Sequence, residues 1–310
     1  MAFSQGSRSG LSYIKEVTFG VTPAGNFKAL PFSTNAIGLT KDRVEGTDIR
    51  PDRMTRVDRH GNKNTGGDVS SDLRDGDFDE ILAGAMFSAW DTSPTGPDIL
   101  KTGVTFQSFS IEDAAQDISQ YQLFTGQAVS TLAISVAPNQ MVKATIGFVG
   151  SDMSISTSGK TVDAGSGAAP FDSYSGEIKL GNVGGSVAVA TVTSVDFTLD
   201  NGLNPTFVVG SDSTPQLEYG RAKVEGTMVV YFENADIMDR FINETESELI
   251  VSINDPTGAN EYTFGFPRIK INSADVPVSG EQSRMVTCAF VALYDDTTGT
   301  NFYIERPETV

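Results

Sequence analysis

Hydrophobic residues along the chain occur mainly in short runs in which apolar and polar positions alternate, a pattern typical of β-strands. Gly, Asn, Asp and Ser separate the runs, and the 310 residues include 31 Gly and 13 Pro. Two segments, at about 76–87 and 235–243, show the apolar spacing that predicts an amphipathic helix. The sequence therefore predicts a mainly β protein in which helix is the minority element.

Two segments repeat the same order of apolar positions although few of their letters match. They read GDVSSDLRDGDFDEILAGAM from Gly67 and GTMVVYFENADIMDRFINET from Gly226. In each, a strand leads into a helix, and an Asx residue, Asp75 or Asn234, stands where we expect the helix N-cap. In an ungapped alignment the coinciding apolar positions are Val69, Leu73, Phe78 and Leu82 with Met228, Phe232, Ile237 and Phe241.

The repeated pattern extends on both sides of these segments. After each helix come three predicted strands, of which the first ends in Ser-Ile-x-Asp, at 108–113 and 250–255. The last strand of each set, at 144–150 and 286–292, shares Thr and Phe-Val in register. Before each opening Gly come a strand and a long polar excursion. We therefore predict duplicated β-sandwich or barrel units, each with one flanking α-helix and one long loop.

This duplication defines the domain organisation that we expect. The segments are an N-terminal arm at 1–26, a first copy at 27–150 with a long loop at 36–65, a linker and hairpin at 151–190, a second copy at 191–295 with a shorter loop at 201–224, and a C-terminal strand or arm at 296–310.

Charge is strongly acidic overall and unevenly distributed. Forty acidic and 22 basic residues give a net charge of −18, which opposes non-specific binding to nucleic acid. Residues 41–63 hold seven basic and five acidic residues, a net +2, which leaves 15 basic and 35 acidic residues, a net −20, elsewhere. We infer that residues 41–63 contact a surface that the rest of the chain would repel.

No catalytic, cofactor-binding or metal site is predicted. One cysteine, Cys288, and one histidine, His60, leave no internal disulfide and no Cys/His zinc site. The acidic run at 75–80 lacks the spacing of a calcium loop and is better explained as a helix cap with residues that complement the helix dipole. The SGKT at 158–161 lacks the first Gly of a phosphate-binding loop, and no carboxylate pair is singled out among the 40 acids.

The N-terminal segment has no apolar core of signal-peptide length, and no apolar run approaches the roughly 18 residues of a membrane helix. We therefore expect synthesis in the cytoplasm and no membrane insertion.

Several segments together resemble a known family, and the resemblance covers nearly the whole chain. They are YIKEVTFGVTPAGNFKALPF near the start, TDIRPDR, GDFDEIL, FTLDNGL followed by FVVGS, GTMVVYFENADIMDRFINETES, and FVALYDDTTGTNFYIER near the end. This set resembles the major tail tube proteins of long-tailed siphophages, especially those of flagellum-seeking phages of enteric bacteria.

The resemblance implies a non-enzymatic virion protein whose rings stack into a tail tube that carries genomic DNA. It implies a β-sandwich with a flanking helix as the repeated unit, assembly in the host cytoplasm, and tape measure, tail terminator and distal tail proteins as partners. A long loop would reach the neighbouring ring. The inter-ring contact residues that we expect are Lys41, Arg43, Arg50, Arg53, Arg56, Arg59 and Lys63.

Because we predict that the tail tube unit occurs twice in this chain, three chains would supply six units. We therefore expect a trimeric ring with pseudo-six-fold symmetry, and the alternative is a true hexamer whose second copy decorates the outside. The rival functions are a tail fibre or decoration protein and a secreted adhesin or carbohydrate-active protein. The lack of a signal peptide weighs against the secreted protein, and the lack of fibre repeats weighs against the fibre.

Overall fold

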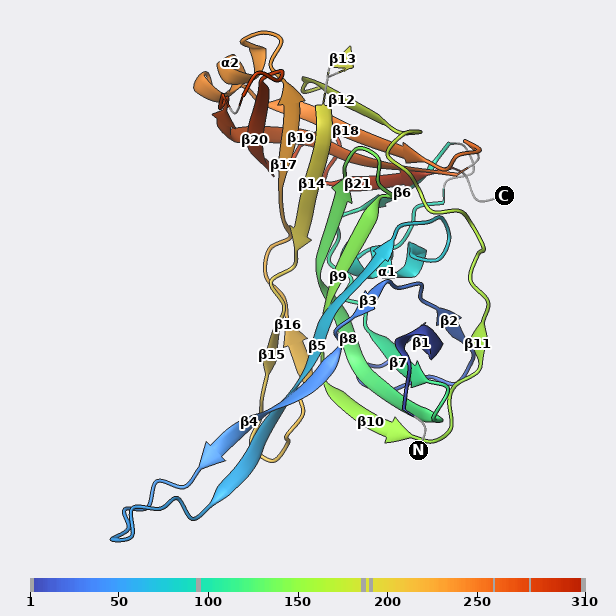
Figure 1. The fold of residues 1–310 in the computed structure, drawn as a ribbon, viewed down its shortest axis with the longest axis vertical. Coiled ribbons are helices and arrows are strands. Elements are labelled where there is room, and N and C mark those ends of the chain that lie inside the picture. Colours follow the sequence, from blue (N-terminus) through green and yellow to red (C-terminus); the bar gives the residue numbers. More distant parts are fainter. Residues whose placement is uncertain are drawn as a thin grey trace.

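The computed structural model describes residues 3–92, 96–184, 188–189, 192–258, 260–278 and 280–307. Strands dominate these residues, and the two α-helices found there are α1 (Asp79–Ala85) and α2 (Asp236–Ile242), beside one short 3-10 turn at Gly6–Arg8. Each helix lies within its predicted range. The prediction of a mainly β fold is confirmed (Figure 1).

One set of strands in the first half forms an antiparallel sheet around β5, the strand that precedes α1. Three strands follow α1 as a meander, and the last of them, β9, returns to pair with β5. The other side of β5 pairs with β3 and β4. These strands are β3 (Thr34–Asn35), β4 (Gly38–Glu45), β5 (Asp58–Asp72), β7 (Phe109–Ala115), β8 (Gln120–Val136) and β9 (Lys143–Gly150).

The second half repeats this order of pairing. Its last meander strand, β20, returns to β17, and β14 pairs with the other side of β17. A β-bulge interrupts the second meander strand at the same place, after Val129 in β8 and after Ile271 in β19. These strands are β14 (Val192–Asp200), β17 (Lys223–Tyr231), β18 (Ser247–Asn254), β19 (Glu261–Asp275) and β20 (Met285–Ala292).

The two halves are joined by pairing between β8 and β14, in which Val136 lies opposite Val195 and Thr131 lies opposite Asp200. One continuous antiparallel sheet therefore runs from β3 and β4 through β5, β9, β8, β14, β17 and β20 to β19. We call it the joined sheet.

Each half also has a second group of strands that shares its long meander strand with the joined sheet. In the first half β1 (Ser9–Lys15) pairs along its length with β7, β2 (Phe27–Ala29) pairs with β1 and in parallel with β11 (Val162–Asp163), and β10 (Asp152–Ser156) pairs with β8. In the second half β12 (Glu177–Asn182) pairs with β18 and β13 (Ala188–Val189), and β21 (Tyr303–Arg306) pairs with β19 and β6 (Asp98–Lys101). A strand thus lies in the expected N-terminal arm, and four of these strands lie in the expected linker and hairpin.

One hydrophobic core extends across both halves because every second residue of the joined sheet points inward. Phe197 of β14 packs its ring 4.9 Å from Phe266 and 5.6 Å from Phe302, so the aromatic cluster of the second half begins at the joint. The two helices differ in their burial. Five residues of α1 are buried, whereas no residue of α2 is.

The two helix N-caps require a correction to the sequence prediction. The N-cap of α1 is Phe78 without a side-chain hydrogen bond, so Asp75 does not cap it. Gly76, with φ 79°, turns the chain after Asp75, and the helix therefore begins later. For α2 the N-cap is Ala235, and the neighbouring Asn234 accepts the N–H of Asp236 through Oδ1 at 2.9 Å.

A buried polar network ties β21 to the first half. The Arg306 guanidinium pairs with Asp79 and Asp98 and lies 4.3 Å from the Trp90 ring, while Tyr262 donates its hydroxyl to Asp79 Oδ1 at 2.5 Å. Burial, and then the Asp79 carboxylate, raises the pKa of Tyr262 well above its ordinary value, so the hydroxyl stays protonated as a donor. The network thus links α1 and β6 to β19 and β21.

We predict that Arg306→Ala destabilises the whole chain because it removes the guanidinium from two carboxylates, one of them on the fully buried Asp98. Breaking a buried ion pair costs about 3–5 kcal/mol. The matched control is Lys28→Ala, which removes the exposed pair with Glu80 and is expected to change little. Urea unfolding followed by circular dichroism measures both variants, and equal losses would contradict the prediction.

Candidate functional site: a sheet face and a projecting arm

The outward face of the joined sheet consists largely of small, hydroxyl-bearing and acidic side chains. The register places them side by side across the strands, with Asp196 opposite Ser135 on one side and Thr227 on the other. Six of these residues are acidic and two are lysines. This surface, which we call the outer face, comprises Asp68, Ser70, Asp72, Thr131, Ala133, Ser135, Lys143, Thr145, Gly147, Asp196, Thr198, Asp200, Lys223, Glu225, Thr227, Val229, Ser273, Asp275, Thr287, Ala289 and Val291.

Local contacts leave the outer face acidic. Lys223 pairs with Glu225 at 2.8 Å, so one of the two lysines is neutralised on the face itself. Asp196 and Asp200 have no ion pair among the described residues. Because the alternate side chains of the same strands are buried in the core, the face cannot turn inward without exposing them.

Both edges of the joined sheet lack a strand partner within the described part of the chain. One is the edge of β3 and β4 away from β5, and the other is the last part of β19, beyond its pairing with β18 and on the side away from β20. Unpaired edges present free N–H and C=O groups and promote pairing with another chain.

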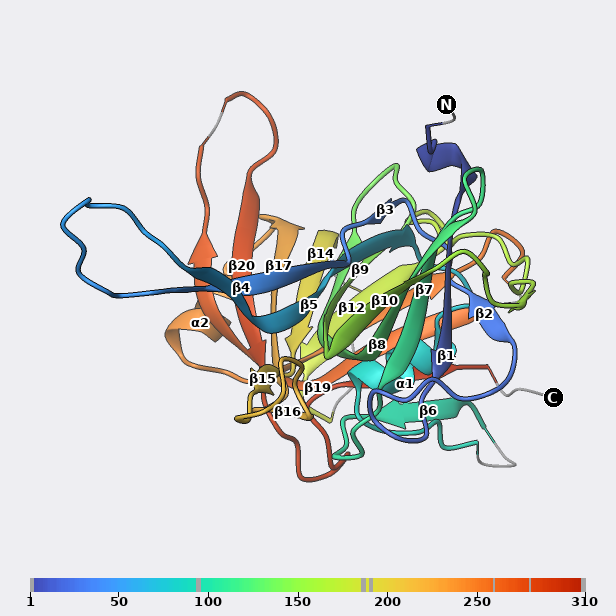
Figure 2. The ribbon, with the colours of Figure 1, turned by 90° about the horizontal axis from the view of Figure 1, so that it is seen from below.

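Strands β4 and β5 extend past the body of the molecule as a twisted two-stranded arm (Figures 1 and 2). They pair from Gly38 opposite Gly66 out to Glu45 opposite Asp58, and residues 46–57 form the tip. Nearly all residues of the outer arm are exposed. An isolated two-stranded ribbon of this kind is only marginally stable in water.

The arm holds all seven basic residues that we expected at an inter-ring contact, and the structure divides them into two sets. Three already pair within the chain: Arg43 with Asp58 at 2.7 Å, Arg50 with Asp52 at 2.5 Å, and Lys63 with Asp152 at 3.0 Å. The hydrogen bond to Asp152 raises the pKa of Lys63, which stays charged at the base of the arm. The other four have no ion pair among the described residues and are Lys41, Arg53, Arg56 and Arg59.

Exposed apolar side chains on the arm were missed by reasoning from charge. Ile49 is fully exposed and Met54 is 71% exposed at the tip, and Val44 and Val57 are exposed beside them. Apolar anchors surrounded by cations are typical of a protein-binding surface. The only signal in the sequence was the presence of these four letters inside a polar excursion.

The second half has a short hairpin in place of the arm. Strands β15 (Asn204–Thr206) and β16 (Gln216–Glu218) form it between β14 and β17, and it lies beside the base of the arm (Figure 1). The Lys63 N–H donates to the Asp212 carbonyl at 2.7 Å. The two expected loops thus project on the same side of the molecule.

The opposite end of the long axis carries α2 (Figure 1). Residues 233–248 around it include six acidic residues and one arginine. Phe241 and Ile242 remain 38% and 67% exposed. This end is therefore acidic and apolar, where the arm is basic and apolar.

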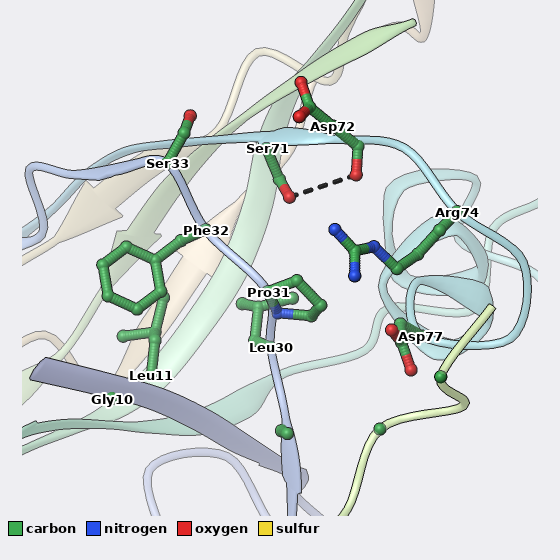
Figure 3. Close-up of a pocket in the computed structure, with 13 residues that line it drawn as sticks. Gly10, Leu11, Leu30, Pro31, Phe32, Ser33, Ser71, Asp72, Arg74 and Asp77 are labelled. Carbon is green, nitrogen blue, oxygen red and sulfur yellow. Dashed lines mark hydrogen bonds between the residues drawn. The ribbon is translucent and has the colours of Figure 1, made fainter. Parts of the chain in front are cut away.

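A surface pocket beside β1 and the end of β5 is lined by residues that include Leu11, Pro31 and Phe32 (Figure 3). The Arg74 guanidinium points into it near Ser71 and Asp77, and the buried Arg74 Nε has no hydrogen-bond partner among the described residues. No cluster of three or more metal-ligating side chains occurs in the part that the structure describes. The SGKT segment forms a loop in which the Lys160 N–H donates to Glu112, and His60 lies exposed on the arm.

Within the described residues, no helix is long and apolar enough to span a membrane. Comparison with curated proteins gave no match. The model of the family described as phage tail tube protein matches residues 6–292, from the first strand to the end of β20 and thus across both halves of the fold. The chain therefore belongs to the phage tail tube protein family, whose members are structural components of the virion tail.

Proposed function

We propose that this protein assembles into rings that stack as the non-contractile tail tube of a siphovirus, and that genomic DNA passes through the bore into the host. The observation that supports this most directly is the joined sheet, whose outer face carries small and acidic side chains and whose two edges have no strand partner among the residues that the structure describes. A sheet that closes with other copies into a barrel loses its edges. The outer face would then line the bore.

An acidic bore suits the transport of DNA because carboxylates repel the phosphates and therefore do not bind them. Small side chains would keep such a wall free of obstacles. The flagellum-seeking phages of enteric bacteria are the proposed relatives, and assembly in the host cytoplasm with tape measure, tail terminator and distal tail proteins follows from this proposal.

We further propose that the arm docks on the adjoining ring. Its exposed cations and its apolar tip complement the acidic, apolar end around α2, and these two surfaces lie at opposite ends of the molecule. A head-to-tail contact of this kind does not close on itself and therefore propagates along an axis. Rings would stack in one polarity.

The repeated pairing order favours a ring of three chains. Each half presents one meander of the same topology to the joined sheet, so three chains would present six. We predict that cryo-electron microscopy of purified tubes, reconstructed without imposed symmetry, shows three chains and pseudo-six-fold symmetry in each ring. Six identical subunits per ring would contradict the trimer, and an absence of rings and tubes would contradict the tail tube function itself.

Charge reversal on the arm is predicted to abolish stacking but not folding. Arg53, Arg56 and Arg59 are exposed and have no ion pair among the described residues, so Arg53→Glu, Arg56→Glu and Arg59→Glu together should leave rings that no longer form tubes. Negative-stain microscopy measures tube length, and circular dichroism checks the fold.

The matched control for the arm reverses three exposed cations outside it, Lys15, Lys160 and Arg221. This control changes the net charge equally and should still give tubes. Tubes of normal length from the arm variant, or loss of its fold, would show that the arm cations do not mediate stacking.

The outer face is predicted to bind duplex DNA negligibly. Reversal of three of its acids, Asp196→Lys, Asp200→Lys and Glu225→Lys, should create measurable affinity at low salt, and this affinity should fall steeply as salt is added. A mobility-shift assay on the unassembled protein measures both forms. Micromolar binding by the unaltered protein would contradict the prediction.

The matched control for DNA binding places the same charge change on dispersed exposed residues. Asp163→Lys, Glu233→Lys and Glu281→Lys lie away from the outer face. Binding as strong as that of the outer-face variant would show that total charge, rather than this face, controls the affinity.

A further inference from the structure

The joint between β8 and β14 inside one chain shows how two tail tube units pair. Thr131 lies opposite Asp200, Ile134 opposite Phe197, and Val136 opposite Val195. The inward side chains of this joint are buried, with Val136 6% exposed. One unit therefore offers the last part of its long meander strand, and the next unit offers its first strand.

Each of these two strands has an exact counterpart elsewhere in the same chain. Val129 and Thr131 flank the bulge in β8 and lie opposite Phe148 and Gly147, and Ile271 and Ser273 flank the bulge in β19 and lie opposite Phe290 and Ala289. Residues 131–136 therefore correspond to residues 273–278.

The first strands correspond in the same way. Ser194 lies opposite Val229 in β17, and Thr34 lies opposite Ser70 in β5. The ungapped sequence match aligns Ser70 with Val229, so Thr34 corresponds to Ser194. Leu199 and Leu39 follow in the same register. Residues 195–200 therefore correspond to residues 35–40.

We propose that residues 273–278 of one chain pair antiparallel with residues 35–40 of the neighbouring chain in the ring. The register repeats that of the internal joint, with Thr40 opposite Ser273, Ile37 opposite Val276, and Asn35 opposite Val278. This pairing rests on the proposed ring and names the residues that close it. The joined sheet then continues from chain to chain.

Apolar residues support this pairing. The inward positions Leu132, Ile134 and Val136 of the internal joint correspond to Ala274, Val276 and Val278. Val136 is buried under β14, whereas Val278 is 72% exposed. An apolar side chain that is buried in the first copy and exposed at the equivalent position of the second indicates that another strand packs there in the assembly.

Backbone groups at the two edges support the same register. The Ile37 N–H points away from β5 and is held by Asn35 Oδ1 at 3.0 Å, and the Val276 carbonyl accepts from Arg284 at 2.9 Å. In the proposed register these two backbone groups lie opposite each other. In the single chain, side chains thus form hydrogen bonds with the two backbone groups that would bond to each other across the proposed pairing.

Pro277 fits the proposed register because its missing N–H is not needed there. The Asn201 N–H donates to the Ser130 carbonyl, so residues 200 and 131 of the internal joint form a non-hydrogen-bonded pair. Such pairs recur every two residues, so residues 196 and 135, four residues further on, form another. Pro277 corresponds to Ser135 and its partner Ala36 to Asp196. The Ala36 N–H already donates to Asp68 in β5, as this geometry requires.

A disulfide between neighbouring chains tests the register. Thr40 and Ser273 would form a non-hydrogen-bonded pair on the outer face, a geometry that a disulfide spans. The variant Thr40→Cys with Ser273→Cys, assembled under reducing conditions and then oxidised, should convert most chains into covalent multimers on non-reducing gels. The native Cys288 can stay, because burial raises its pKa to about 11 and the thiol remains unreactive.

Two further variants make the result specific. Thr40→Cys with Ala274→Cys shifts one residue to the opposite side of the strand, and it should give almost no multimers. Asp200→Cys with Thr131→Cys places the same disulfide at the internal joint, and it should give a faster-migrating single chain. The largest multimer of the first variant counts the chains in the closed ring.

Separate outcomes distinguish the pairing from the proposed function. Tubes that form normally but show no cross-link in the first variant, or an equal cross-link in the shifted variant, would overturn the register while leaving the tail tube function in place. If Thr40→Cys with Ser273→Cys does not assemble, Gly38→Cys with Asp275→Cys tests the next pair on the same face, with the same expected result. Unaltered protein that forms no rings would overturn the proposed function.

Discussion

Hydrogen bonding between β8 and β14 is the interaction on which the rest of this structure depends. It converts two similar units into one sheet, and it places the inward residues of both units in a single core. The same pairing aligns the acids of both halves on one outward face. Without it each half would have an additional unpaired edge beside its own core, which sheets rarely tolerate.

Much of the fold could be predicted from the sequence because alternating polarity and turn residues act locally. The ungapped match of Val69 with Met228 identified positions that occupy equivalent places opposite β9 and β20. Helix positions were predicted to within a few residues, whereas the N-cap at Asp75 was wrong because Gly76 turns the chain before α1 starts. The strands at Ser9–Lys15 and Tyr303–Arg306 depend on distant partners, which a local pattern does not specify.

The candidate surfaces were predicted less completely. Charge counting located the arm, but it could not separate Lys63, which pairs at the base, from Arg56, which is exposed near the tip. The acids of the outer face were hidden among 40 acidic residues because only the register between strands shows which of them share one side. The exposed Ile49 could have been noticed, since an apolar letter in a polar loop has no core to enter.

The network around Arg306 has a consequence for the order in which the chain can fold. Arg306 bonds to Asp98, 208 residues earlier, and β21 pairs with β6 across a similar separation. Such contacts have a high contact order, and they form slowly because a long loop must close first. The second strand group of the second half is complete only when β6 from the first half pairs with β21. We therefore expect the two units to fold together as one cooperative unit rather than one after the other as independent domains.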